Sequence, residues 1–210
     1  MPRENRASAP DLERRTFTAD AMRVETRAEG GARLMGHAAV FNQTVKIGRW
    51  FRERIAPGAF RRAIAEDDVR ALFNHDEDWV LGRNRAGTLR LSEDAVGLAI
   101  DISPPDTQLV RDLVLAPVAR GDVSQMSFGF KMMREEWDES EEIPLRTLLE
   151  VELFDVSPVT FPAFPTTDVA LRTLETRRTQ TQNAADCRAA AIIAARQRRL
   201  RLALLEAEAR

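Results

Sequence analysis

The sequence predicts an α+β protein: mainly an antiparallel β-barrel of six or seven strands with peripheral helices, plus a C-terminal helical tail. Two observations lead to this fold class. Through most of the chain, short apolar runs are separated by turn-forming residues, which is typical of short strands. After Pro165 the sequence becomes polar and then rich in Ala, Leu and Arg. We therefore expect a disordered arm over 1–16, a body over 17–165, and a linker with a basic helical tail over 166–210.

The predicted strands follow one another with turn signals between them. Residues 1–16 come first and carry no apolar period, as expected of a disordered arm. Weak alternation begins at Phe17 and stops at the Gly30-Gly31 turn. Further strands are predicted over 33–41, 51–56, 69–73, 88–91, 96–102, 123–133 and 146–156. An acidic loop over 135–142 separates the last two.

Two helices are predicted to pack outside the barrel. Residues 59–65 place Phe60 and Ile64 four positions apart, on one helical face. Residues 108–119 have apolar side chains at helical spacing, and Pro117 limits their last turn.

The C-terminal tail differs from the body in charge as well as in pattern. Residues 186–209 contain no Gly or Pro and predict an amphipathic helix. Residues 171–210 carry nine Arg against four acidic residues, a balance of +5, whereas residues 1–170 carry 22 basic and 29 acidic residues, a balance of -7. The opposite signs indicate an acidic body and a basic extension.

Composition excludes several classes of protein. One cysteine and two histidines in 210 residues cannot form an internal disulfide, a Cys-rich zinc site or a three-His metal site, so we expect no metal and no cofactor. No run approaches the roughly 18 apolar residues of a membrane span. The first residues lack the apolar stretch of a signal peptide, and a cytoplasmic protein is the default expectation.

His75 is the most informative single residue. It follows the apolar pair Leu72-Phe73, at the end of a predicted strand, and precedes Asp76. A histidine at a strand end can face both the core and solvent, as a general base must. The alternative is an ordinary loop histidine in an acidic turn.

Ser127 lies in a strand with small residues on one face. Period-2 alternation puts Ser127, Gly129 and Lys131 on one face, and Phe128 and Phe130 on the other. A hydroxyl followed by glycine on a sheet face leaves room for a substrate carbonyl. The alternative is a strand serine beside a glycine that marks a bulge.

A third strand offers carboxylates. Glu150 and Glu152 share one face of the 146–156 strand, opposite Val151 and Leu153. A carboxylate here could orient a histidine and stabilise its imidazolium, as in a Ser–His–acid arrangement. The alternative is a strand with a solvated acidic face.

Several ordered blocks between about residues 35 and 163 resemble one known family. The blocks are Gly36-His37-Ala38-Ala39-Val40-Phe41-Asn42, Glu53-Arg54-Ile55-Ala56-Pro57-Gly58-Ala59-Phe60, Phe73-Asn74-His75-Asp76, Val80-Leu81-Gly82-Arg83, Arg120-Gly121-Asp122-Val123, Met126-Ser127-Phe128-Gly129-Phe130 and Asp155-Val156-Ser157-Pro158-Val159-Thr160-Phe161-Pro162-Ala163. With these blocks the chain resembles the prohead proteases of tailed bacteriophages, the serine peptidases that mature capsids, which are similar to the herpesvirus assembly proteases.

The resemblance implies a barrel with surrounding helices and assigns roles to residues. By motif, Ser127 is the nucleophile and His75 the base. The strand pattern favours Glu150 as the third member, although Asp155 is the acid inside a matched block and Glu152 is a further candidate. Period 2 puts Asp155 and Glu150 on opposite faces unless a bulge intervenes.

The resemblance also implies a mechanism and partners. The serine would attack a peptide carbonyl, and water would release the acyl-enzyme. Expected substrates are scaffold segments, an arm of the major capsid protein and the protease itself, in the host cytoplasm inside the assembling prohead; self-association is also expected. His37 matches a block but is expected to be structural. The herpesvirus enzymes place an arginine after the corresponding strand to help hold the oxyanion, whereas the stretch Ser157-Pro158-Val159-Thr160 contains none. The oxyanion donors stay open, with a backbone N–H as one candidate.

Two other function classes compete with the serine protease. A non-enzymatic capsid assembly or scaffolding module would keep the fold without the activity, and the intact His75, Ser127 and Glu150 argue against it. A nucleic-acid-binding protein would explain the arginine-rich tail, but the acidic body argues against it. The tail itself is interpreted as a targeting or scaffold-binding segment removed by self-cleavage, with a coiled-coil assembly segment as the alternative.

Overall fold

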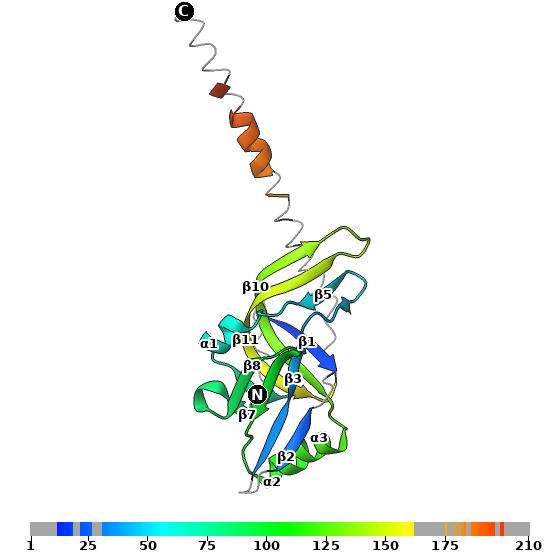
Figure 1. Ribbon diagram of the computed structural model, residues 1–210, viewed down its shortest axis with the longest axis vertical. Coiled ribbons are helices and arrows are strands. Elements are labelled where there is room, and N and C mark those ends of the chain that lie inside the picture. The colour runs from blue at the N-terminus through cyan, green and yellow to red at the C-terminus, as the bar shows by residue number, and fades with distance from the viewer. Residues whose placement is uncertain are drawn as a thin grey trace, which may run out of the picture. The chain divides into compact units, whose positions relative to one another are not determined.

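The computed structural model divides the chain into two compact units, Met1–Thr166 and Thr167–Arg210 (Figure 1). Each unit is considered by itself. The structure describes residues 12–18, 22–26, 31–161, 175, 179, 182–183, 186–195 and 198–199.

The larger sheet of the first unit has seven strands. They are β1 (Glu13–Thr18), β4 (Val45–Ile47), β5 (Phe51–Ile55), β6 (Arg70–Phe73), β7 (Asp76–Arg83), β10 (Gln125–Asp138) and β11 (Leu145–Val159). The order is β1-β10-β11-β5-β4, and β6 pairs with both β11 and β7. The long β10–β11 hairpin is the centre of this sheet, and its loop projects at the upper end of the body in Figure 1. Both β5 and β6 run parallel to β11, but at opposite ends of it.

The smaller sheet has four strands in the order β2-β3-β9-β8. They are β2 (Arg23–Thr26), β3 (Ala32–Val40), β8 (Leu89–Glu93) and β9 (Gly97–Ile102). The helices are α1 (Arg61–Glu66), η1 (Asn84–Ala86), α2 (Gln108–Val110), η2 (Arg111–Leu115) and α3 (Ala116–Arg120). The last three form one continuous helical stretch with a π-helical segment in the middle, and α3 lies beside β2 (Figure 1).

The prediction of a β-barrel is wrong, because neither sheet closes among the residues that the structure describes. The mixture of strands and helices agrees with the predicted α+β class. Both sheets contribute to one hydrophobic core, with Phe128 and Leu153 from the larger sheet and Leu34 and Ile100 from the smaller one. Packing one sheet on the other buries the apolar faces that closure would otherwise have to bury. Alternation along a strand predicts which face is buried. It does not predict whether that face is buried inside a closed barrel or between two packed sheets.

The predicted elements are largely present, with differences at the edges. The expected helices correspond to α1 and to the stretch from Gln108 to Arg120. The strand β7 was not predicted, because its acidic start resembles a loop. Strand β1 begins at Glu13, inside the arm that we expected to be disordered, whereas residues 1–11 lie outside the described residues.

A buried network of ion pairs holds β1 in the sheet. Arg15 Nε lies 2.5 Å from Glu53 Oε1, and Arg146 Nη1 lies 2.9 Å from both Glu13 Oε2 and Glu53 Oε2. Arg146 Nε also donates to Glu135 Oε2 at 2.5 Å. We call these five residues the β1 ion network. The network explains how β1 belongs to the sheet although its sequence has no apolar alternation. Its buried positions hold the charged side chains Glu13 and Arg15.

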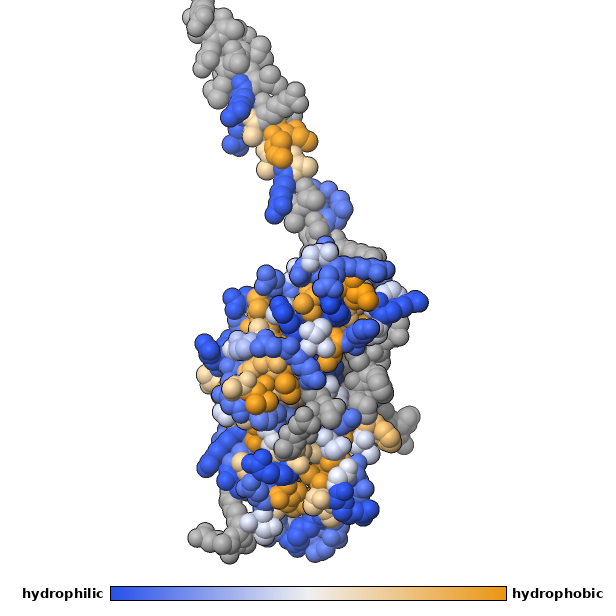
Figure 2. Space-filling view, turned by 45° about the vertical axis from the view of Figure 1, so that its right-hand side comes forward, coloured by the Kyte–Doolittle hydropathy of each residue, from blue (hydrophilic) through white to orange (hydrophobic). Residues whose placement is uncertain are grey.

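The second unit is helical over residues 186–195, within the predicted tail helix. Its apolar side chains are exposed, with Ile192 70% and Ile193 57% accessible, and Figure 2 shows this apolar surface. The rest of the predicted tail lies largely outside the described residues. In the described parts of both units, no helix is both long and apolar enough to cross a membrane.

Candidate active site

A two-residue turn at the tip of the β6–β7 hairpin carries His75. Phe73 pairs with Asp76, and the two turn residues between them, Asn74 and His75, have φ values of 56° and 58°. Positive φ at both central positions is the geometry of a type I′ hairpin turn. Among residues other than Gly, both Asn and His are enriched in this uncommon conformation. The pair Asn74-His75 can therefore form the tight turn, which places His75 at the tip of the hairpin.

His75 joins Ser127 to Asp155 through its two ring nitrogens. Nδ1 lies 2.6 Å from Asp155 Oδ2, and Nε2 lies 2.7 Å from Ser127 Oγ. Because a carboxylate only accepts, Nδ1 is the nitrogen that donates to Asp155, and in the neutral imidazole Nε2 then accepts from the serine hydroxyl. The side chains of His75 and Asp155 are 7% and 9% exposed, and Ser127 is fully buried. The three side chains therefore form one shielded hydrogen-bonded chain.

Asp155 is held by two further features. Ser157, which is also fully buried, donates its hydroxyl hydrogen to the same Oδ2 at 2.6 Å. Across the hairpin, Asp155 pairs with Gly129. A Cβ at Gly129 would lie closer than 3.0 Å to Asp155 Oδ1, so only glycine leaves room for this carboxylate. The space that we predicted for a substrate carbonyl is therefore occupied by the Asp155 side chain.

A bulge in β11 determines which acidic side chains of this strand point toward His75. Gly129 pairs with Asp155, but the next residue, Phe130, pairs with Leu153. The extra residue between them, Phe154, shifts the alternation by one position, so Asp155 and Glu152 both line the same pocket. The bulge needed to bring Asp155 onto the same strand face as Glu152 is therefore present.

The structure does not bring Glu150 to His75. Its Oε1 accepts from Arg62 Nε at 3.0 Å. At about 3.3 Å per strand residue, five positions separate Glu150 from Asp155 by roughly 16 Å. Because of this distance, Glu150 does not reach the His75 imidazole, although it lies on the same strand as Asp155. Glu152 lines the pocket and pairs in register with Lys131, and no hydrogen bond joins it to His75.

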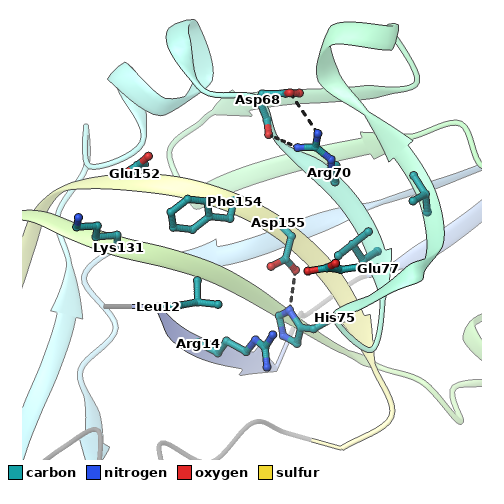
Figure 3. A pocket seen from close by; sticks show the side chains of 12 residues that line it. Leu12, Arg14, Asp68, Arg70, His75, Glu77, Lys131, Glu152, Phe154 and Asp155 are labelled. Carbon is teal, nitrogen blue, oxygen red and sulfur yellow. Dashed lines mark hydrogen bonds and ion pairs between the residues drawn. The ribbon is translucent and has the colours of Figure 1, made fainter. Parts of the chain in front are cut away.

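The pocket beside the triad has a volume of about 720 Å³. His75 and Asp155 form part of its wall, and Figure 3 shows Arg14 beside the imidazole. Its lining includes apolar side chains (Leu12, Leu72, Val80 and Phe154) and charged ones (Arg14, Asp68, Arg70, Glu77, Lys131 and Glu152). Strand β1 thus contributes to the site, which the sequence did not suggest.

His37, the only other histidine, lies outside this site. Its Nε2 is 2.8 Å from Asp94 Oδ2, on the smaller sheet. The backbone N–H of Gly97, and then the hydrogen bond with His37, lowers the pKa of Asp94. In the part of the chain that the structure describes, no group of three or more His, Cys, Asp or Glu side chains could hold a metal ion.

Sequence reasoning missed Ser157 and Asn74 as parts of the site. Both occur in blocks that carry the resemblance, and Ser157 is two residues from Asp155. Period 2 would have placed Ser157 and Asp155 on one face. The contribution of Asn74 could not be read from the sequence, because its partner is 86 residues away.

A nucleophile, a base and an acid in this geometry are characteristic of serine hydrolases. The family model described as caudovirus prohead serine protease matches residues 18–183, which is most of the chain. The chain belongs to this family, and a serine protease of phage capsid maturation is what membership indicates. No curated protein and no solved structure gives a significant match.

Proposed function

We propose that Ser127 is the nucleophile, His75 the general base and Asp155 the acid of a peptide hydrolase. The hydrogen-bonded chain through both nitrogens of His75 is the observation that carries this proposal. Family membership independently supports serine protease chemistry. Asp155 replaces Glu150 as the proposed third member, because Glu150 is paired with Arg62.

The proposed mechanism follows from the tautomer. As Ser127 Oγ attacks the scissile carbonyl carbon, its proton passes to Nε2 of His75, and Asp155 stabilises the imidazolium through Nδ1. The imidazolium then protonates the leaving amine, and the C–N bond breaks to give an acyl-enzyme. Water attacks the ester with His75 as base, which releases the acid product and regenerates the serine. Because Ser127 is fully buried, the side chains around it must move for a peptide to reach Oγ.

The proposed substrates are scaffold segments or an arm of the major capsid protein, together with the protease itself, inside the assembling prohead. These substrates come from the family and not from the pocket, whose wall carries charges of both signs. Self-association also stays a prediction. The C-terminal tail is proposed to be a targeting or scaffold-binding segment that self-cleavage removes. Mass spectrometry of purified proheads would detect the shortened chain, and an intact tail there would contradict this part of the proposal.

Co-expression with the phage's major capsid protein tests the central proposal. Wild type is expected to shorten the capsid protein or its scaffold segment, and Ser127→Ala is expected to leave both intact. An alkyl fluorophosphonate provides a second assay, because Ser127 Oγ would bond to phosphorus, fluoride would leave, and His75 would take the serine proton. Equal cleavage and labelling by wild type and Ser127→Ala would refute the assignment of the nucleophile.

A further inference from the structure

One asparagine side chain joins the tip of the β6–β7 hairpin to the end of β11. Asn74 Nδ2 donates to Thr160 Oγ1 at 3.1 Å, and Asn74 Oδ1 accepts from the Thr160 backbone N–H at 2.8 Å. In addition, the Asn74 backbone N–H donates to the Pro158 carbonyl at 2.9 Å. Both polar atoms of the amide are therefore bonded to a single residue on the neighbouring strand end. We call the two side-chain contacts the Asn74–Thr160 clamp.

We propose that the Asn74–Thr160 clamp positions His75 for its role as general base. The inference rests on the proposed function, since it concerns the residue next to the proposed base. Neither clamp residue reaches the reacting atoms, so both are positioning residues and not catalytic ones. The clamp acts on the backbone of the turn, and the turn determines where the imidazole lies.

The hairpin tip needs such a restraint because its other contacts are irregular. Apart from the Asn74 N–H bond to Pro158, strand β6 pairs with β11 only at Arg70 and Ala71, four to five residues before His75. The β6–β7 ladder then changes register between Ala71 and Leu72 and again between Leu72 and Phe73. A two-stranded ribbon that extends beyond the sheet is marginally stable by itself. Catalytic geometry, in contrast, must be held to within about 0.5 Å.

Asn74 meets two requirements that no other residue type combines. Its φ of 56° demands a residue that tolerates the left-handed region, which favours Gly, Asn and Asp. Its amide also supplies a donor to the Thr160 hydroxyl and an acceptor for the Thr160 N–H. Glycine would meet the first requirement and Asp would keep only the acceptor. Substitution by glycine therefore removes the clamp while it keeps the backbone conformation of the turn.

The chain offers a matched control for this substitution. Asn42 also adopts a positive φ, of 58°, in an exposed turn. Its backbone N–H donates to Ile55, and it lies outside the pocket that His75 lines. Asn42→Gly thus makes the same chemical change, with the same effect on backbone freedom, away from the active site.

The experiment compares wild type, Asn74→Gly, Thr160→Val, Thr160→Ser and Asn42→Gly as full-length chains, with Ser127→Ala as the inactive reference. A misplaced base slows reaction by up to about 100-fold for a 1 Å error. We expect Asn74→Gly and Thr160→Val to label with an alkyl fluorophosphonate about 10- to 100-fold more slowly than wild type. Thr160→Ser keeps the hydroxyl and is expected to restore most of the rate, and Asn42→Gly is expected to label at the wild-type rate. Thermal unfolding midpoints of the same samples show whether each variant is folded.

A nuclear magnetic resonance signal provides a readout that does not depend on activity. Since its Nδ1 lies 2.6 Å from Asp155 Oδ2 in a nearly buried position, we expect the Nδ1 proton of His75 to exchange slowly with water and to give a visible low-field signal. With only two histidines in the chain, the signals of His75 and His37 are readily assigned. We expect Asn74→Gly and Thr160→Val to weaken the His75 signal and to leave His37 unchanged.

The outcomes separate the clamp from the proposed function. Wild-type labelling and an unchanged His75 signal in folded Asn74→Gly and Thr160→Val would overturn the clamp. Equal losses in Asn42→Gly would also overturn it, since they would reflect backbone freedom alone. If wild type and Ser127→Ala behave alike in the labelling and cleavage assays, the proposed function fails, and the His75 signal still decides whether the clamp positions the imidazole.

Discussion

Gly129 and Asp155 face each other across the β10–β11 hairpin, and the missing side chain of the glycine is the space that the carboxylate occupies. A Cβ at position 129 would lie below 3.0 Å from Oδ1, nearer than real Cβ atoms approach another group. Asp155 cannot retreat from such a Cβ without disturbing the hydrogen bonds that its Oδ2 makes with His75 and Ser157. The choice of glycine at position 129 and the place of the Asp155 carboxylate are therefore coupled, although the two residues are 26 positions apart in the sequence.

Gly129→Ala is expected to abolish most of the activity without removing any of the proposed catalytic groups. The new methyl group would push the Asp155 carboxylate away from Nδ1 of His75, and a displacement of this kind is expected to slow fluorophosphonate labelling about 100-fold. Gly121→Ala is the control, because a Cβ there meets nothing within 4 Å although its φ of 83° is strained. That control should lower the unfolding midpoint while the labelling rate is kept. A Gly129→Ala protein that labels at the wild-type rate would show that Asp155 is not needed where it lies.

The identity of the acid is decided by comparing Asp155→Asn with Glu150→Gln. The first change keeps the shape but removes the charge that holds the His75 tautomer, and a loss of activity of roughly 10³- to 10⁴-fold is expected. The second breaks a partly exposed ion pair with Arg62, and such pairs contribute about 0–1 kcal/mol to stability. Glu150→Gln should therefore cleave the capsid protein almost as well as wild type. The reverse ranking of the two variants would restore Glu150 as the acid.

From the sequence we expected Ser127, His75 and, as the favoured one of three carboxylates, Glu150, whereas the structure joins Asp155 to His75. The reason for this difference lies in strand pairing. Alternation along β10 correctly placed Ser127 and Gly129 on one face, because period 2 is a local property of a strand. Which carboxylate joins them depends on the bulge at Phe154, and that bulge exists only in relation to the partner strand. No pattern within β11 alone contains this information.

The same limit applies to the fold. Apolar spacing indicated most strands and both main helices, but it could not indicate whether the sheet closes or packs on a second sheet. Strand β1 was missed for a different reason: its buried residues Glu13 and Arg15 are charged, so their burial depends on Glu53 and Arg146, far along the chain. Such a strand carries no hydrophobic signal.

Removing a positive charge from the β1 ion network is expected to destabilise the fold more than removing a negative charge. It contains three carboxylates and two guanidinium groups, an excess of one negative charge. Arg146→Met would raise that excess and leave buried carboxylates unpaired, which is expected to lower the free energy of unfolding by about 3–5 kcal/mol. Glu53→Gln would make the network neutral and keep its shape, so a smaller loss is expected. Urea denaturation measures both, and equal losses would contradict the role of charge balance.

Low pH is expected to destabilise the fold, because it protonates Glu13 of the β1 ion network. Burial alone would raise the pKa of Glu13, but Arg15 and Arg146 together lower it below its ordinary value of 4.5. A carboxyl group with a lowered pKa in the folded state contributes stability that is complete above pH 4.5 and lost as the pH falls through the lowered pKa. The free energy of unfolding of wild type should therefore decrease below this pH. Glu13→Gln should be less stable at neutral pH and lose less stability on acidification, as measured by urea denaturation across the acid range. A variant whose stability falls as steeply as that of wild type would show that other carboxyl groups account for the acid sensitivity.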